Sequence, residues 1–312
     1  MFRLIVTFIR YFYCAAVAVT LILLSFPSTA CCDVSPYKWL PEYVPESAMI
    51  LKIHTPQNYR RIRYQDDSYA EWLRHLPLKK EGSKVYLGYA MKNIQLNHVA
   101  IIDIDQGKRE LQKGIGFTYR LLAEYMYSLE MYQDLRYETE QGTQISFFWD
   151  LYGYKPTVIK NDYQWNWKRQ SIKDYDRFQE FMWKYVKAGT YEGTFQKLER
   201  LKNFNDLRIG DLITRNGFDG CALLVIDMAV NPLDQTKVYL FAFNSVPNQD
   251  LQIMANLGDR ELSPWYSFKK FNVKISTTEF VFQQSDAFRI WNKEPKAAPG
   301  LSPYYLEMPV KE

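Results

Sequence analysis

Apolar residues recur at helical spacing in three stretches of the chain. In the first stretch they fall at positions i, i+3, i+4 and i+7, which is the spacing of one helix face. These residues are Tyr69, Trp72, Leu73 and Leu76. Asp67 or Ser68 can cap this helix, and Pro77 ends it. The same pattern predicts two longer helices, over Glu110–Glu130 and Ser171–Ala188.

Runs of apolar and β-branched residues between these helices predict strands. The predicted strands are Lys84–Tyr89, His98–Asp105, Ile145–Trp149, Asp211–Thr214, Cys221–Ala229, Lys237–Phe243 and Glu279–Phe282. A proline-rich stretch over 31–58 predicts an extended lead-in, and a Lys/Pro/Ala-rich stretch over 292–312 predicts a flexible tail. The region between them, 59–291, has no internal repeat and no long linker. The pattern therefore favours a single α+β domain.

The first 30 residues have the pattern of a secretory signal sequence. Arg3 and Arg10 provide basic charge, and an uncharged, mostly apolar run extends over 11–26. Ser28-Thr29-Ala30-Cys31 resembles a bacterial lipobox, in which the cysteine receives a lipid, although Ser28 replaces the usual leucine. Cleavage after Ala30 and an uncleaved anchor are the alternatives. We expect export and attachment to a membrane of the cell envelope through a lipid on Cys31.

Composition narrows the possible functions. Of the 312 residues, 39 are basic and 35 acidic. Because no polybasic tract accompanies this balance, the chain is not expected to bind nucleic acid. Aromatic residues make up 16% of the chain, which indicates either an aromatic core or a groove that stacks on sugars or bases. The spacing of the four cysteines and three histidines predicts no disulfide framework, metal or cofactor site.

Several short blocks resemble a bacterial family known as domain of unknown function 4846. The blocks cover 72–79, 103–107, 110–112, 120–125, 188–190, 210–211, 225–229 and 263–266. Among them are Trp72-Leu73-Arg74-His75-Leu76-Pro77 and Val225-Ile226-Asp227-Met228-Ala229. Their order and spacing agree with the family over about residues 54–291.

The family pattern resembles papain-like and NlpC/P60-like thiol hydrolases. This resemblance implies an antiparallel sheet packed against helices, with a cysteine where this chain has Gly114 and a histidine where it has Cys221. A helix N-terminus favours the thiolate of such a cysteine, and the histidine transfers the proton. Here both positions differ, and Phe243 stands where a glutamine is expected. The resemblance therefore implies a catalytically degenerate member.

Three other sources of activity are possible. His98 could serve a different reaction, although a histidine that opens a strand is usually a hydrogen-bonded edge residue. Cys221 could be a nucleophile with His98 as its base, although a single cysteine with apolar neighbours is more often an inert core residue. Asp103 and Asp105 are spaced to share a strand face and could bind a cation, but solvated strand ends are the more common case. Asp211 and Asp227 are interpreted as turn and strand-end residues.

The leading hypothesis is an envelope binding protein without catalytic activity. Its groove would be lined by Gly114, Cys221, Phe243 and Asn244 and would bind a peptide, a glycan or an envelope protein. One alternative is an active cysteine amidase or peptidase that acts on cell-wall material through Cys221. A further alternative is a structural lipoprotein subunit. An open groove at Gly114 would favour the binding protein. A contact between Cys221 and His98 would favour catalysis, and a filled groove would favour a structural role.

Overall fold

The computed structural model describes most of the chain after the leader. The described residues are 35–40, 42–86, 92–93, 97–106, 109, 111–139, 142–159, 162–167, 175–190, 196–215, 221–244, 249–268, 274–277, 281–293, 296 and 304. The predicted signal sequence and Cys31 lie outside them. Within these ranges, no helix has both the length and the apolar character needed to cross a membrane. All helices and strands below belong to one compact unit, Tyr37–Glu312.

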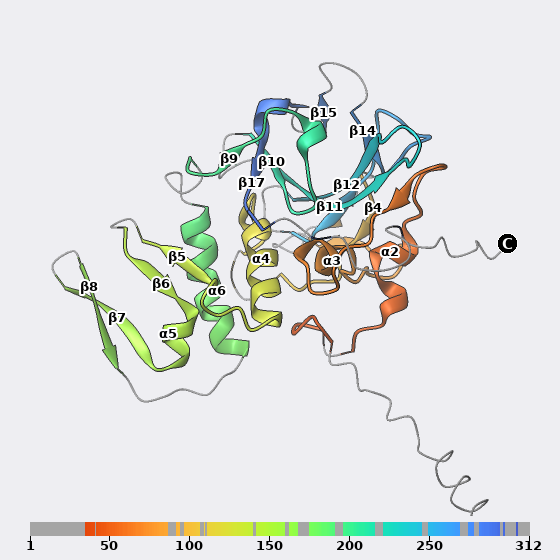
Figure 1. Ribbon diagram of the computed structural model, residues 1–312. Helices are drawn as coiled ribbons and strands as arrows, with labels where there is room; N and C mark the ends of the chain where they lie inside the picture. The colour runs from red at the N-terminus through yellow and green to blue at the C-terminus, as the bar shows by residue number, and fades with distance from the viewer. Residues whose placement is uncertain are drawn as a thin grey trace, which may run out of the picture. The chain divides into compact units, whose positions relative to one another are not determined.

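Two long strands form the centre of the fold (Figure 1): β11 (Ala222–Val230) and β12 (Lys237–Asn244). They pair antiparallel, with a bulge between Val225 and Asp227. Every residue of β11 is buried, as its nearly continuous apolar run predicts. Both strands were predicted from the sequence, and each extends one residue beyond its predicted end. The predicted α+β class, with one antiparallel sheet and few helices, is confirmed.

Seven further strands complete a nine-stranded antiparallel sheet, whose main order is β4-β13-β12-β11-β10-β17-β9. In addition, β1 pairs with β11 and β14 pairs with β12. These strands are β1 (Arg60–Arg61), β4 (His98–Ile101), β9 (Glu199–Arg200), β10 (Leu212–Thr214), β13 (Gln252–Met254), β14 (Tyr266–Ser267) and β17 (Ala287–Arg289). Strand β4 is therefore at one end of this order.

Four two-stranded pairs lie outside the main sheet. They are β2 (Val85–Tyr86) with β3 (Lys92–Asn93), β5 (Arg136–Glu138) with β6 (Gln144–Ser146), β7 (Tyr154–Ile159) with β8 (Asp162–Trp167), and β15 (Ile275–Ser276) with β16 (Val281–Phe282). The longest, the β7–β8 hairpin, was not predicted. Figure 1 shows it beside α5 (Phe147–Leu151), apart from the nine-stranded sheet.

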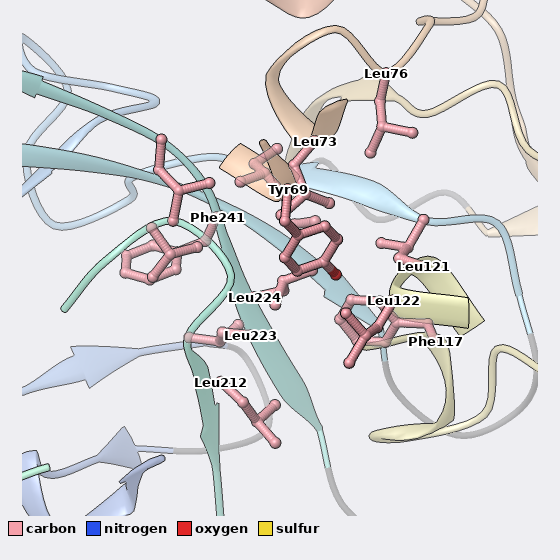
Figure 2. Close-up of a cluster of buried hydrophobic side chains, with 14 of the residues drawn as sticks. Tyr69, Leu73, Leu76, Phe117, Leu121, Leu122, Leu212, Leu223, Leu224 and Phe241 are labelled. Atoms are coloured by element: carbon pink, nitrogen blue, oxygen red, sulfur yellow. The ribbon is translucent and has the colours of Figure 1, made fainter. Parts of the chain in front are cut away.

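Helix α3 packs against the central strand β11, and α4 packs against both α3 and α6. The remaining helices are α2 (Met49–Lys52), α3 (Tyr69–Arg74), α4 (Gly116–Ser128) and α6 (Tyr175–Gly189), with 3-10 turns at Pro45–Ser47, Phe204–Asp206 and Gln284–Asp286. Figure 2 shows Leu73 of α3 and Leu122 of α4 near Leu224 of β11. All three side chains are almost fully buried. The first 3-10 turn and α2 fall within the expected extended lead-in.

Local signals explain where the helix predictions held and where they were wrong. Ser68 caps α3 as predicted, because its hydroxyl accepts a hydrogen bond from the Glu71 amide. The long helix begins at Gly116 rather than Glu110, because Gly114 has a left-handed backbone with φ of 51°. The predicted strand Ile145–Trp149 is wrong after Ser146. There the Ser146 hydroxyl accepts from the Phe148 amide and starts α5 instead.

Two residues of the expected tail, Lys296 and Tyr304, form backbone contacts with residues that follow β1. The Gln65 amide donates to the Lys296 carbonyl at 3.0 Å, and Ile62 forms an antiparallel bridge with Tyr304. Residues 294–295, 297–303 and 305–312 lie outside the described residues. The flexibility of those remaining positions stays a prediction.

Candidate functional site

Gly114 lies in the turn that leads into α4. The residue is buried and lies two positions before the helix begins. Its positive φ suits glycine, because a Cβ atom strains this backbone conformation. Position 114 therefore combines the absence of a side chain with a backbone that disfavours one.

The segment before α4 contacts the sheet close to Cys221. The Asn244 side-chain amide donates to the Gln112 carbonyl, and Asn244 pairs with Ala222, the residue after Cys221. Cys221 is a buried thiol, with 2% of its surface exposed, and Asn244 is fully buried. Phe243 is partly buried and pairs with Leu223 and with Gln252, a buried glutamine. The Asn244 side chain thus joins the segment before Gly114 to the part of the sheet that follows Cys221.

A polar network, buried except for the exposed Asp105 side chain, occupies the region around Gln112. The Gln112 side-chain amide donates a hydrogen bond to the Asp105 backbone carbonyl at 2.6 Å. The fully buried Arg120 guanidinium donates to the same carbonyl and to the Asp105 carboxylate, the latter at 2.6 Å. Asp103 and Asp105 do not share a strand face, because β4 ends at Ile101. Asp105 is instead the acceptor that holds Arg120 beneath the turn.

Glu124 joins this network from the next turn of α4. Its carboxyl group lies 4.0 Å from the Arg120 Nε and accepts a hydrogen bond from the Tyr175 hydroxyl at 2.7 Å. Burial raises the pKa of Glu124 to about 7 against the lowering effects of Arg120 and Tyr175. Since Asp105 already balances the charge of Arg120, a second carboxylate here is disfavoured.

Sheet order separates the thiol from the histidine considered as its base. His98 is on β4, and Cys221 immediately precedes β11. Strands β13 and β12 lie between them, so three strand spacings of about 4.8 Å separate the two strands. A thiol and an imidazole cannot form a hydrogen bond across that distance. The structure does not bring Cys221 and His98 together.

Asp227 is not a strand-end residue, contrary to the sequence-based interpretation. It follows the bulge inside β11 and is fully buried. Arg61 donates to one carboxylate oxygen at 2.6 Å and Arg74 to the other at 2.8 Å. Arg74 also donates to Glu71 at 2.8 Å. Burial raises the pKa of Asp227, but the two guanidinium groups together lower it by more. The pKa of Asp227 therefore lies below its ordinary value.

Asp211 agrees with the turn interpretation. Its carboxylate accepts a hydrogen bond from the Arg208 amide at 2.8 Å, within the turn that precedes β10. Arg289 of β17 donates to both of its oxygens at 3.1 Å. Asp211 and Asp227 are therefore both carboxylates that are ion-paired with arginines.

A cavity of about 530 Å³ lies beside β4, a volume within the usual range of ligand pockets. Its walls come from the end of α2, the turn over 79–83, β4, and Ser263-Pro264. Lys52, Lys79 and Lys80 contribute ammonium groups, against the single carboxylate of Glu81. One of the three is already paired, because Lys79 lies 3.0 Å from Asp250.

A larger cavity of about 820 Å³ lies between α3 and the end of α4. Tyr69, Tyr125 and Trp291 contribute aromatic rings to its lining, but the two tyrosines are only 3% and 5% exposed. Its lining also includes Lys293 and Lys296, whose neighbours at 294–295 and 297–300 lie outside the described residues. The cavity beside β4, with continuous described walls, is the better defined candidate.

Sequence reasoning missed the residues that line the cavity beside β4. His98 was noted, but only as a base for Cys221 or as an edge residue. The Lys79-Lys80-Glu81-Gly82-Ser83 segment carried a turn signal in its glycine, although no pattern places this turn opposite β4. Within the described ranges, no group of three or more His, Cys, Asp or Glu residues could hold a metal ion.

Comparison with known proteins identifies the domain but no activity. The family model described as "Domain of unknown function (4846)" matches residues 50–289, well over half of the chain. Neither the curated proteins nor the solved structures include a match to this chain. The resemblance of the family pattern to papain-like and NlpC/P60-like hydrolases therefore stays a prediction.

Proposed function

Because the chain belongs to the family of domain of unknown function 4846, whose name records no activity, we propose its function from the site itself: a binding protein without catalytic activity. The observation that carries this proposal is the pair of positions where a thiol hydrolase needs its reacting groups. Gly114 has no side chain and a left-handed backbone. Cys221 is a buried thiol with two strands between it and the strand of His98.

Export supports the same function. The apolar leader and the lipobox-like Ser28-Thr29-Ala30-Cys31 favour a protein that is exported from the cytoplasm and held at the cell envelope. Only a few residues would then lie between the lipid on Cys31 and Ser35, the first described residue. We propose that the binding site works at this membrane surface.

The cavity beside β4 is the proposed ligand site. Lys52 and Lys80 are exposed at its walls, and their ammonium groups favour an anionic ligand. Strand β4 ends the sheet order and can offer backbone groups of its outer edge to an extended chain, except at Ile101, whose carbonyl accepts from the Lys79 amide. A short peptide that bears carboxylates, as cell-wall peptides do, combines both properties. The ligand class proposed here is therefore a carboxylate-bearing peptide.

Residues 33–312 are expected to bind such peptides without cleaving them. Peptidoglycan stem peptides should bind in calorimetry, while mass spectrometry shows no product from them, from casein or from acyl esters. Replacing both Lys52 and Lys80 by glutamine should weaken binding by about fivefold, since each exposed ion pair contributes on the order of 0.5 kcal/mol. Lys84 is exposed in the same segment but does not line the cavity. Lys84→Gln is therefore the matched control and should bind the peptides as the wild type does.

The assay separates the competing functions. Turnover that disappears in Cys221→Ser would show an active cysteine hydrolase and refute the binding proposal. Turnover that survives this change would place an enzyme site elsewhere in the chain. Binding that the Lys52/Lys80 variant leaves unchanged would remove the β4 cavity as the site, while the non-catalytic function would stand.

Lipid attachment has its own test. Cells that express the full chain are grown with a fatty-acid analogue suitable for chemical tagging. The wild type should be labelled and Cys31→Ala should not, because Cys31 is the proposed acceptor. Cys32→Ala is the matched control and should keep the label. Labelling of Cys31→Ala at the wild-type level would refute anchoring at this residue.

One observation favours a second function, that of a structural lipoprotein subunit. Gly114, Cys221 and Asn244 are all buried, so none of these three residues offers an exposed surface to a ligand. A subunit of this kind would bind none of the peptides and would still be labelled on Cys31. The two experiments together distinguish it from the binding protein.

A further inference from the structure

The cavity between α3 and the end of α4 has an aromatic wall. Three rings form it, those of Tyr69, Tyr125 and Trp291, and the ring centroids of each pair lie 4.9 to 6.3 Å apart. The two tyrosines are almost fully buried, whereas Trp291 is only partly buried against the core. The ring that a ligand in this cavity can contact is therefore the indole of Trp291.

Contacts with the two tyrosines fix the orientation of this indole. The Trp291 ring meets the Tyr69 ring at an interplanar angle of 68° and the Tyr125 ring at 86°. Edge-to-face arrangements of this kind are favourable for aromatic pairs. Because the indole is ordered before a ligand arrives, little side-chain entropy is lost when a ligand stacks on it.

The turn before α3 contributes polar side chains to the same cavity. Gln65, Asp67 and Ser68 line it, and the side chains of Gln65 and Asp67 are exposed. Two hydrogen bonds hold the backbone of this turn: the Tyr125 hydroxyl donates to the Asp67 carbonyl at 2.8 Å, and the Ser68 amide donates to the Gln65 carbonyl at 2.9 Å. A carboxylate and an amide on a fixed turn can therefore accept and donate hydrogen bonds beside the aromatic wall.

The charges at this cavity favour a neutral ligand. Among its described lining residues, the ionic groups are those of Asp67, Lys293 and Lys296. Lys293 already forms an ion pair with Asp134 at 2.8 Å, which leaves one carboxylate and one ammonium group. This balance differs from the cavity beside β4, where ammonium groups outnumber the single carboxylate. Neither an anion nor a cation is therefore favoured by net charge.

A saccharide has the properties that these walls require. The C–H groups on one face of a sugar ring are apolar and can stack on an indole, while the hydroxyl groups at its edge exchange hydrogen bonds with carboxylate and amide side chains. A nucleobase would also stack, but the phosphates of a nucleotide need positive charge that the described walls do not have in excess. The volume of about 820 Å³ lies within the usual range of ligand pockets.

We propose that this cavity binds a neutral saccharide, which stacks on Trp291 and forms hydrogen bonds to the Asp67 carboxylate. The site is separate from the peptide site beside β4, because the described linings of the two cavities share no residue. It does not depend on that site. The aromatic content of the sequence indicated either an aromatic core or a groove that stacks on sugars or bases. Here the two tyrosines belong to the core, and the indole beside them forms the binding face.

The test uses residues 33–312, which contain every described helix and strand, and two saccharides that carry no peptide. These are the tetramer of N-acetylglucosamine and maltotetraose, and at least one of them should bind in calorimetry. Trp291→Leu should weaken binding by about tenfold, because the stacking ring is removed. Asp67→Ala should weaken it by about fivefold, because a hydrogen-bond acceptor is lost. Asp66→Ala changes an exposed neighbour that does not line the cavity, and it should bind as the wild type does.

Further variants separate binding from folding and from the other cavity. Trp291→Tyr keeps an aromatic ring and should bind more tightly than Trp291→Leu. The exposed Asp67 side chain can be removed without opening the core, so Asp67→Ala should keep the circular dichroism spectrum and the thermal midpoint of the wild type. The Lys52/Lys80 variant should bind the saccharide unchanged, so that a failure at one cavity leaves the other proposal standing.

Three results would overturn the saccharide site. The first is a wild-type protein that binds neither saccharide, whether or not it binds adenosine. The second is equal affinity of Asp67→Ala and Asp66→Ala for the saccharide. The third is equal affinity of Trp291→Tyr and Trp291→Leu, since stacking requires a ring at this position.

Discussion

Replacing Asp227 by alanine is expected to lower the free energy of unfolding by about 3–5 kcal/mol, close to the largest effect of any single substitution. Urea denaturation of residues 33–312 at pH 7 measures it. Asp227 is fully buried and ion-paired with Arg61 and Arg74. Its removal leaves a buried positive charge that no other group balances.

The charge balance of this cluster explains the size of the effect. Arg61 and Arg74 face Asp227 and Glu71, two positive against two negative groups, and none is more than 7% exposed. Hydrogen bonds from the arginines to the Ile53 and Ile62 carbonyls hold the guanidinium groups in place. Without Asp227 these arginines cannot turn to water, so the desolvation cost of one charge is no longer offset.

An exposed ion pair supplies the matched control. Asp134 pairs with Lys293 at 2.8 Å, but the two side chains are 44% and 59% exposed. Asp134→Ala should therefore change the stability by no more than about 1 kcal/mol. Equal losses in the two variants would show that burial does not determine the contribution of Asp227.

The second large effect concerns pH and Glu124. Relative to Glu124→Gln, the wild type should lose about 3 kcal/mol of stability as the pH rises from 4.5 to above 7. Burial raises the pKa of this carboxyl from 4.5 to about 7 in the folded chain. The difference corresponds to about 3 kcal/mol, because each pKa unit is worth 1.36 kcal/mol.

The sign follows from proton binding. Between these two pKa values the folded chain keeps the Glu124 proton while the unfolded chain has lost it. Stability from this group is thus fully present below pH 4.5 and is lost as the pH rises through about 7. Glutamine keeps the shape and an acceptor for the Tyr175 hydroxyl, but it does not titrate. The difference between wild type and variant isolates this one group.

Denaturation curves at a series of pH values provide the measurement. Glu180→Gln, at an exposed position of α6, is the control and should follow the wild type at every pH. If the Glu124→Gln and wild-type curves run parallel across the whole range, the assigned role of Glu124 is wrong.

The elements that the sequence predicted well are those with a local cause. The apolar runs of β11 and β12 require burial wherever the rest of the chain lies, and both strands form where expected. Ser68 caps α3 through a hydroxyl only three residues from its donor. Errors arose where one local signal outweighs another, as at Ser146, whose cap turns an apparent strand into α5.

The candidate site could not be predicted to the same extent. The resemblance to thiol hydrolases predicts that Gly114 and Cys221 stand at the nucleophile and base positions, and this assignment stays a prediction. The sequence could not show that Gln112 and Asn244 bring these segments together. It also could not show that the sheet order separates Cys221 from His98.

The sequence by itself therefore determined the fold class, the two central strands and the capped helix. Tertiary structure alone decided what the buried charges do. Asp227 looks like the end of an apolar run until Arg74 and Arg61, 153 and 166 residues away, are placed against it. The physical reason is range: caps and apolar periodicity act within a few residues, whereas an ion pair depends on a distance in space that no sequence spacing reveals.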